Sequence, residues 1–258
     1  MVESFRLSIK NFFEGTGDAV FFFKAFVRNI FRGGFEWNEF LKQCYLVGVK
    51  SLNIVLLTGF VLGFVLTLQS LPTLKEFGAE SWVPDMVAIS VIREIGPVII
   101  ALICAGKIAS GIGAELGSMK VTEQVDAMEV SGANPMKYLV ATRILACTLM
   151  VPLLVLFADG MSFIGGFIGM NVAGEMTATL YFNKSFINLL FSDLFPAIIK
   201  TVLFGFCIGF IGCYKGYKAN KGTESVGVAA NSAVVASCVA IIIIDAIAVQ
   251  ITSFFVYN

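Results

Sequence analysis

Long apolar segments separated by short polar ones make up most of the chain. The apolar segments run for about 20 residues or more, long enough for a helix to cross the hydrocarbon core of a bilayer. They lack the alternation of apolar and polar positions that strands of a membrane barrel show. We therefore predict an all-α integral membrane protein with about five transmembrane helices. The predicted spans are residues 51–74, 86–114, 138–172, 194–214 and 226–256.

A different pattern marks the N-terminal arm. In residues 18–32 basic side chains recur at every fourth position, while apolar side chains fall on the opposite side of a helix. The basic set is Lys24, Arg28 and Arg32, and the apolar set is Phe22, Phe23, Phe26 and Ile30. This pattern predicts an amphipathic helix in the membrane interface, and the alternative is a helix docked on the protein itself. We divide the chain into an N-terminal interfacial region, residues 1–42, and a transmembrane domain, residues 43–258.

Composition agrees with a membrane protein and argues against several functions. Apolar residues make up 57% of the chain and charged residues only 14%, far from the average of soluble domains. Lys plus Arg and Asp plus Glu number 18 each, so no net basic field points to nucleic acid as a partner. The chain has no histidine, the commonest general base and metal ligand, and its six cysteines lack CxxC spacing. We predict no catalytic residues and no metal site.

The distribution of lysine and arginine predicts the orientation of the chain. Five spans place the two termini on opposite sides of the membrane. Basic residues concentrate in the N-terminal arm and in the loop between the last two spans, which carries Lys215, Lys218 and Lys221. By the positive-inside rule both segments are cytoplasmic, and the C-terminus lies outside.

The loop between the second and third predicted spans is acidic, although the same topology makes it cytoplasmic. It contains the segment "EQVDAMEV", residues 123–130, preceded by Thr122 and followed by Gly132 and Pro135. Thr122 is a suitable N-cap and the glycine and proline are suitable stops, so we predict a short helix here. Its acidic side and the apolar Val125 and Met128 suit a helix that docks into a groove of another protein. The alternative is a solvated connector.

Four charged residues lie inside predicted spans at a similar depth in the outer leaflet. They are Arg93, Glu94, Lys200 and Asp245, and their formal charges sum to zero. Charges at membrane depth cost at least about 2.5–3.5 kcal/mol each near the bilayer centre, so they are expected to pair or to face a cavity. Pro97 predicts a kink beside Arg93 and Glu94.

Two interpretations of this charged cluster stay open. In the first, the cluster lies beside a lipid pocket, with Arg93 or Lys200 available to a phosphate and with an apolar wall that includes Leu66, Leu68 and Val91. In the second, the cluster is an ion-pair network that only fixes helix packing. Asp159 has no obvious partner in the sequence, and we assign it a structural role. Lys107 can extend to the headgroups.

Small residues at four-residue spacing predict close approach of helices. The pairs are Gly59 with Gly63 and Gly205 with Gly209, and a longer stripe comprises Ala105, Ala109, Gly113 and Gly117. Packing within the chain is the default interpretation, and a subunit interface is the alternative.

Two separated blocks of the sequence resemble the MlaE/YrbE permeases. The first is "REIGPVIIALICAGKIASGIGAELGSMKVTEQVDAMEVSGANPMKYLVATR", and the second joins "IGCYKGYKANKGTESVG", "ANSAVVAS" and "IIIIDAI". The resemblance runs from about residue 40 to the C-terminus. One departure is Ala141 and Thr142, where the family often has a proline before the arginine.

The resemblance implies a homodimeric permease in the inner membrane of a Gram-negative bacterium, with its C-terminus in the periplasm. It implies an MlaF-like cytoplasmic ATPase dimer, an MlaB-like STAS-domain protein bound to that ATPase, a periplasmic MlaD-like hexamer of MCE domains, and phospholipid as cargo, transported to maintain outer-membrane lipid asymmetry. The chain lacks the GxxxxGK[ST] phosphate loop, so we expect ATP and magnesium to bind the partner ATPase and no cofactor to bind this chain. The short acidic helix would then be the coupling helix, with contacts from Glu123, Gln124, Asp126, Ala127 and Met128.

Other functional classes fit less well. An ion-coupled secondary transporter of a lipid or another amphiphile would explain the intramembrane charges. The halves of the chain, however, show no inverted repeat, and the acidic helix would have no role. An intramembrane enzyme is disfavoured by the absence of histidine and of a recognisable nucleophile and base.

Overall fold

The computed structural model describes residues 17–30, 34–173, 176–219 and 222–256. Within these residues every regular element is helical, and five helical segments are long and apolar enough to cross a membrane. The five spans are Trp37–Glu76, Glu80–Val121, Met136–Val172, Phe191–Tyr217 and Thr223–Phe254. The predicted all-α class and the five predicted spans are thus confirmed, and most of the observed helical segments are longer than the apolar cores that the sequence indicated.

Several spans consist of more than one helix. The first contains α2 (Trp37–Cys44) and α3 (Lys50–Glu76), and the second contains α4 (Val83–Ser90), α5 (Gly96–Cys104) and α6 (Ser110–Val121). The remaining spans are formed chiefly by α8 (Thr142–Ala173), α10 (Phe191–Tyr217) and α11 (Thr223–Val256). Two shorter helices connect spans, α7 (Gln124–Val130) and α9 (Ala178–Ile187).

Single turns of π-helix join the pieces of the first two spans and begin the third. They are Tyr45–Val49, Val91–Ile95, Ala105–Ala109 and Met136–Ala141. The turn Val91–Ile95 carries Arg93 and Glu94, and Pro97 follows in the first turn of α5. Since proline has no N–H to donate, an interruption of the regular bonding pattern is expected here. The kink predicted from Pro97 takes the form of this π turn.

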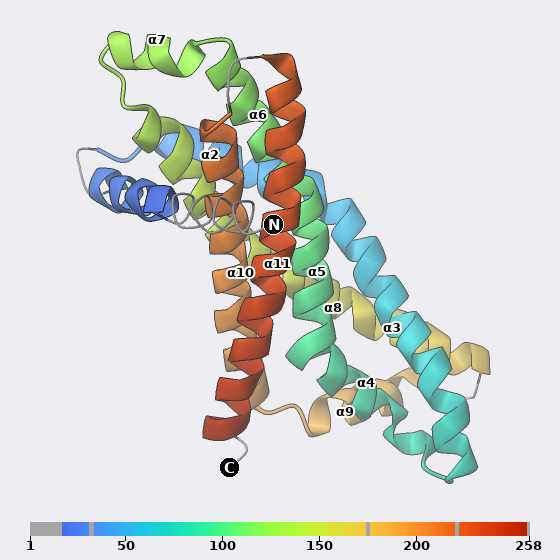
Figure 1. The fold of residues 1–258 in the computed structure, drawn as a ribbon. Coiled ribbons are helices and arrows are strands. Elements are labelled where there is room, and N and C mark those ends of the chain that lie inside the picture. Colours follow the sequence, from blue (N-terminus) through green and yellow to red (C-terminus); the bar gives the residue numbers. More distant parts are fainter. Residues whose placement is uncertain (1–16, 31–33, 174–175, 220–221, 257–258) are drawn as a thin grey trace, which may run out of the picture.

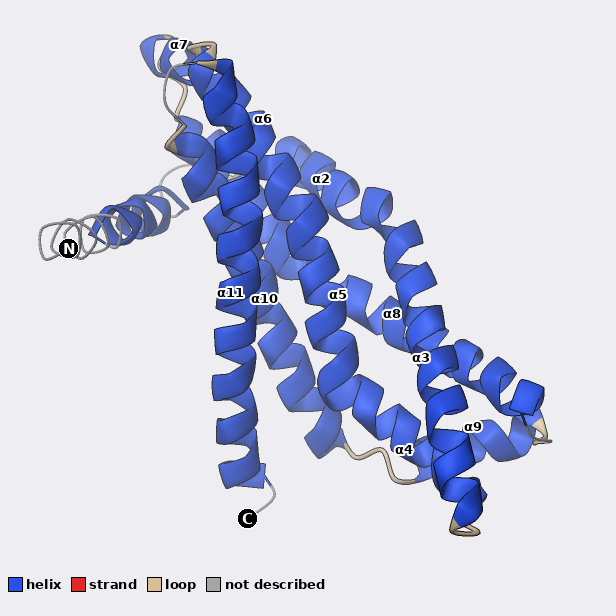
Figure 2. Cartoon of the chain, turned by 45° about the vertical axis from the view of Figure 1, so that its right-hand side comes forward, coloured by secondary structure: helices blue, strands red, loops and turns tan. Residues whose placement is uncertain are grey.

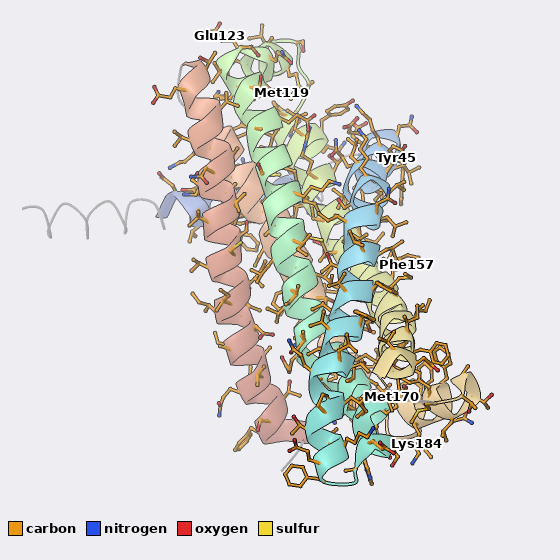
Figure 3. All side chains as sticks on the ribbon, turned by 90° about the vertical axis from the view of Figure 1, so that its right-hand side faces the viewer. Tyr45, Met119, Glu123, Phe157, Met170 and Lys184 are labelled. Carbon is orange, nitrogen blue, oxygen red and sulfur yellow. The ribbon has the colours of Figure 1, made fainter. Side chains whose placement is uncertain are left out.

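The helices gather at one end of the molecule and diverge toward the other (Figure 1). The α7 end carries α7, the end of α10 and the start of α11, and the α9 end carries α4 and α9. Turned by 45°, the molecule shows α10 and α11 on one side and α3 and α8 on the other, with α5 between them (Figure 2). Figure 3 places Met119 and Glu123 at the α7 end and Met170 and Lys184 at the α9 end.

Glycines allow the close contact between α3 and α8 and between α8 and α10. A Cβ atom on Gly59 or Gly63 would overlap the α8 backbone at Ala158 or Ser162, and one on Gly205 would overlap the backbone at Cys147. In the longer stripe, Gly113 faces α11 at Ala229 and Ala230. These glycines therefore serve helix packing within the chain, as the default interpretation predicted.

The helix predicted in the N-terminal arm is present over residues 17–30 and lies across the bundle (Figure 1). Its aromatic side packs on α10, because the ring of Phe22 lies 5.7 Å from that of Phe210 and 5.6 Å from that of Tyr214, and Phe26 is buried. Lys218 donates a hydrogen bond to Asp18, which raises the pKa of the Lys218 ammonium. One side of this helix thus docks on the protein itself. For this side the structure shows the alternative to interfacial placement that the sequence analysis gave for the whole helix.

The other side of the N-terminal helix remains exposed. Val20, Phe21 and Val27 present apolar surface, and Lys24 and Arg28 lie beside them. This combination keeps the interfacial prediction open for the exposed side. Arg32, the third basic residue of the predicted pattern, lies outside the described residues.

Helix α9 was not predicted from the sequence. It packs against α4 at the α9 end, with Tyr181 and Ser185 buried. The amide Nδ2 of Asn188, at its C-terminus, donates a hydrogen bond of 2.8 Å to Asp85 Oδ2 on α4. Helix α9 thereby holds the connection between the third and fourth spans against the second.

Candidate functional site

Lys200 on α10 lies between two carboxylates from other spans. Its ammonium nitrogen is 2.5 Å from Glu94 Oε2, in the π turn before α5, and 3.0 Å from Asp245 Oδ1 on α11. The Lys200 side chain is only 5% exposed, so both carboxylates offset the cost of burying its charge. The structure thus brings together three of the four members of the predicted cluster.

Arg93, the fourth member, binds a residue that the sequence analysis missed. Its Nη2 atom lies 2.5 Å from Asp193 Oδ1, and the Asp193 side chain is fully buried. Asp193 stands in the first turn of α10, where its Oδ2 atom also accepts a hydrogen bond of 3.1 Å from the backbone N–H of Leu190. The sequence signal that could have found it is a carboxylate three residues after the cap position of a helix. With Asp193 the cluster holds two cationic and three acidic side chains.

The charged cluster lines an open cavity of about 280 Å³. Four of the five charged residues contribute, and Glu94 and Arg93 remain 45% and 32% exposed in their side chains. The other lining residues come from α10 and α11: Pro196, Ala197, Val249, Thr252 and Ser253. An ion-pair network that only fixed helix packing would not need an open cavity beside its charged groups.

A larger apolar groove of about 570 Å³ adjoins the charged cavity between α10 and α11. The two share Pro196, Lys200 and Thr252. Its apolar lining comprises Phe195, Ile199, Leu203, Ile244, Ile247, Ala248 and Ile251. A charged compartment and an apolar one therefore meet at Lys200, which suits an amphiphilic ligand.

The predicted apolar wall of Leu66, Leu68 and Val91 lies elsewhere. Val91 is 1% exposed and packs in a core cluster with Leu71, Val87 and Met170, against which Leu66 is placed, while Leu68 is half-buried. These residues are absent from the lining of both the charged cavity and the apolar groove. The reason is that Val91 is held in the packing of α3, α4 and α8, whereas the cavity opens between α10 and α11.

The predicted short helix is α7, and it begins one residue later than expected. Glu123 precedes it with a left-handed backbone conformation at φ 60°, and the Thr122 hydroxyl donates backward to the Ser118 carbonyl at 2.8 Å. Thr122 therefore belongs to the end of α6, which continues to Val121, and the prediction that it caps α7 is wrong. Its hydroxyl satisfies a carbonyl of the preceding helix instead.

Helix α7 is anchored on one side and exposed on the other. Val125 is fully buried and Met128 is half-buried against the core, whereas Glu123, Gln124, Asp126 and Ala127 are exposed. Asp126 pairs with Lys120 of α6 at 2.5 Å. The exposed side therefore combines acidic and neutral residues with the apolar Val130, which is 91% exposed, while Val125 anchors the helix on the protein itself.

Polar contacts fix the segments that support α7. Arg143, which is 1% exposed, lies 2.9 Å from Glu115 Oε1 on α6 through Nη2 and donates from Nη1 to the Leu139 carbonyl at 2.8 Å. Asn134, after α7, donates to Asn29 of the N-terminal helix at 2.8 Å. Span three begins here with the π turn Met136–Ala141, at the position where the sequence departs from the family pattern.

Lys107 has a backbone partner. Its ammonium group donates to the carbonyl of Lys50, at the start of α3. Lys107 thereby links the π turn Ala105–Ala109 to the end of the π turn Tyr45–Val49. This contact, together with its exposure, is compatible with the predicted location near the headgroups.

Comparison with known proteins supports a transport role for the chain. Residues 40–251 match a family model described as Permease MlaE. A probable ABC transporter permease protein of Rickettsia typhi is 39% identical over 203 residues, which cover 79% of this chain and 78% of that protein. A probable ABC transporter permease protein of Rickettsia felis is 37% identical over 232 residues, 90% of each chain. One of Synechocystis is 32% identical over 240 residues, 92% of this chain and 90% of its own.

Proposed function

The chain belongs to the MlaE permease family and is a permease subunit of an ABC transporter, and we propose that its cargo is phospholipid. The proposed path leads between the inner membrane of a Gram-negative bacterium and a periplasmic MCE-domain partner, an MlaD-like hexamer. The proposed cellular role is to maintain the lipid asymmetry of the outer membrane. The permease acts as a homodimer in this proposal.

The meeting of the charged cavity and the apolar groove at Lys200 is the observation that carries the proposal. A phospholipid joins a charged headgroup to acyl chains, and the two compartments match these parts. Arg93 and Lys200 already pair with carboxylates, so a phosphate has to share or replace these partners. A zwitterionic headgroup leaves no charge unpaired in this exchange. Its phosphate pairs with Arg93 or Lys200, and its amine pairs with the carboxylate that this residue releases.

We assign to α7 the role of coupling the permease to the ATPase. An MlaF-like ATPase dimer would receive the exposed residues Glu123, Gln124, Asp126 and Ala127 in a groove, with Met128 at the edge. Buried Val125 joins α7 to the bundle, so a displacement of α7 is passed to α6. ATP and magnesium bind the ATPase in this proposal, and an MlaB-like STAS-domain protein binds through it.

The proposed orientation places the α7 end in the cytoplasm and the α9 end in the periplasm. Lys24, Arg28, Lys215 and Lys218 support it, because basic residues are retained on the cytoplasmic side. The C-terminus of the described chain lies at the end opposite α7 (Figure 1). The charged cavity, lined by Arg93 and Ser253, then lies toward the periplasmic half of the membrane.

Reconstitution into proteoliposomes with the partner ATPase and MCE protein tests the proposal. We expect ATP-dependent transfer of a fluorescent phospholipid between the liposome and the MCE protein, and loss of this transfer on Lys200→Met. Lys184→Met, at a lysine of α9 outside the cavity, is the matched control and should transfer normally. Transfer that continues without ATP but stops when ion gradients collapse would support the ion-coupled alternative, for which the named relatives give no support.

A further inference from the structure

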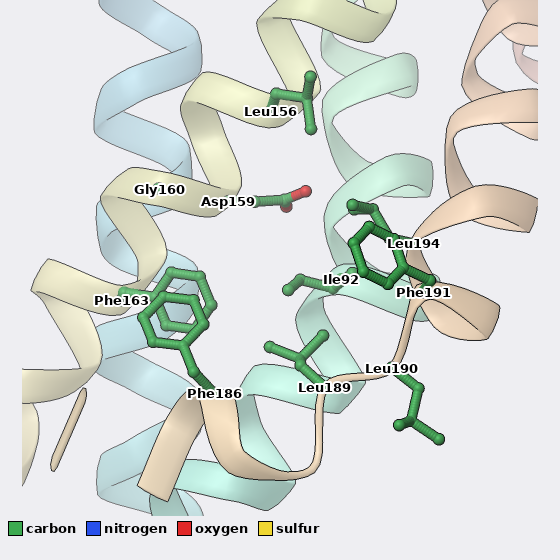
Figure 4. Close-up of a pocket in the computed structure, with 10 residues that line it drawn as sticks. All are labelled: Ile92, Leu156, Asp159, Gly160, Phe163, Phe186, Leu189, Leu190, Phe191 and Leu194. Carbon is green, nitrogen blue, oxygen red and sulfur yellow. The ribbon is translucent and has the colours of Figure 1, made fainter. Parts of the chain in front are cut away.

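A third cavity, which shares no lining residue with the charged cavity, lies between α8 and the connection from α9 to α10 (Figure 4). Its volume is about 380 Å³, within the range of small-molecule sites. Leucine and phenylalanine side chains form most of its lining, and Asp159 is the only ionisable residue among the lining residues. The Asp159 carboxyl points into the space between Leu156, Ile92 and Leu194 (Figure 4).

Asp159 lacks a complement for its carboxyl group in this cavity. The residue is 7% exposed, and its buried Oδ1 atom has no hydrogen-bond partner among the described residues. Gly96 makes room for this oxygen, because a Cβ atom at residue 96 would overlap Oδ1. A buried carboxyl without a partner is costly, particularly within a membrane. A structural role alone, as assigned from the sequence, leaves this group unexplained.

The chemistry of the lining restricts what can supply the missing partner. Since no lysine or arginine lines the cavity, an anionic phosphate would meet the Asp159 carboxylate with no cation to offset the repulsion. A group that donates hydrogen bonds and carries positive charge complements the carboxylate. The surrounding leucine and phenylalanine side chains require the rest of the ligand to be apolar.

The mouth of the cavity gives such a ligand a route from the bilayer. Phe186, Leu190 and Phe191 line the cavity and are 54%, 61% and 89% exposed. Gly160 adds open space to the lining, because a Cβ atom on it would meet nothing within 4 Å. An amphiphile dissolved in the membrane can therefore approach Asp159 with its apolar part remaining in apolar surroundings.

We propose that this cavity binds a hydrophobic amine, whose ammonium group donates hydrogen bonds to Asp159 and whose apolar part packs against Phe163, Leu189 and Leu194. The site is separate from the cavity proposed for the cargo headgroup, and the two share no lining residue. Failure of this proposal therefore leaves the transport proposal unaffected.

Photolabelling of the full chain in phosphatidylcholine nanodiscs tests the proposal. The probe is an alkyl chain with a diazirine and a terminal primary amine, and the matched probe ends in a hydroxyl. We expect saturable labelling of peptides within residues 156–163 and 186–194 by the amine probe, competed by octylamine and not by octanol. Asp159→Asn should weaken the saturable labelling at least about tenfold, the effect of losing a hydrogen bond to a charged group.

Two glycine variants keep the test decisive if Asp159→Asn does not fold. Gly160→Phe retains the carboxyl and fills the cavity, so it should also abolish saturable labelling. Gly227→Phe adds the same side chain at another helix position that is open around its Cβ and should label like the parent. Equal labelling by the amine and hydroxyl probes, or labelling insensitive to both Asp159→Asn and Gly160→Phe, would overturn the proposal.

The source of the amine can be assigned in the same experiment. Nanodiscs that contain phosphatidylethanolamine present a primary amine on a lipid headgroup. Competition by this lipid would place its phosphate beside Asp159, where no cation lines the cavity, and would overturn the proposal. Saturable labelling that this lipid does not reduce supports the proposal with a free lipophilic amine as ligand.

Discussion

Arg143 and Glu115 bind each other at the base of α7, with Nη2 of Arg143 2.9 Å from Oε1 of Glu115. The Arg143 side chain is 2% exposed and that of Glu115 is 52% exposed. A carboxylate that reaches solvent thus neutralises a buried guanidinium, and the pair joins α6 to the beginning of the third span.

We expect Glu115→Ala to destabilise the protein by roughly 1–3 kcal/mol, because the buried Arg143 guanidinium then keeps only the Leu139 carbonyl as an acceptor among the described residues. The exposure of Glu115 favours the lower end of this range. Thermal unfolding in detergent measures the change. Glu224→Ala, at an exposed glutamate at the start of α11, should change stability by less than about 0.5 kcal/mol.

We expect Glu94→Gln to reduce lipid transfer more than it reduces membrane insertion, because the amide cannot neutralise Lys200. Lys200→Met should reduce stability further, since both Glu94 and Asp245 then lose their cation. Transfer in the reconstituted system and the amount of inserted protein are the two measurements. Normal transfer by Glu94→Gln would favour the interpretation in which the charged cluster serves packing alone.

We expect the double reversal Glu123→Lys and Asp126→Lys to abolish association with the ATPase while the spans remain folded, because both side chains are exposed on α7. Co-purification of the ATPase measures the association. The matched control is Lys120→Gln, which breaks the Lys120–Asp126 pair but keeps the acidic surface. Unchanged association in the double variant would remove α7 from the coupling site.

We expect Gly63→Ala to destabilise the protein by roughly 1–3 kcal/mol, because the added methyl group overlaps the Ser162 backbone and forces α3 away from α8. Gly227→Ala, where the methyl group enters open space in a helix, should instead stabilise by about 0.5–1 kcal/mol. Unfolding of the two variants under one condition gives the comparison. Equal effects would show that the α3–α8 contact tolerates a wider spacing.

The sequence contained enough to predict the spans and most of the charged cluster, because hydropathy and the cost of buried charge act on each residue by itself. Glu94, Lys200 and Asp245 could be grouped by their depth in the membrane alone. The pairing of Arg93 with Asp193 could not be predicted from depth, because it depends on where the start of α10 lies relative to the π turn Val91–Ile95.

Other features required the packed structure. The ten residues of α9 are too few to cross a membrane, so hydropathy gave no signal for them. The apolar lining beside Lys200 comes from α10 and α11, whereas Leu66 and Val91 were chosen from spans one and two. The unpartnered oxygen of Asp159 is a property of its surroundings, which residue type alone does not reveal.

The two π turns Val91–Ile95 and Ala105–Ala109 divide span two into three helices, α4, α5 and α6. The turn Val91–Ile95 directs two neighbouring side chains to the same helix, because Arg93 pairs with Asp193 and Glu94 pairs with Lys200, both on α10. Neighbouring residues of a regular α-helix point about 100° apart. One interruption of the backbone of span two therefore positions both of its ion pairs with span four.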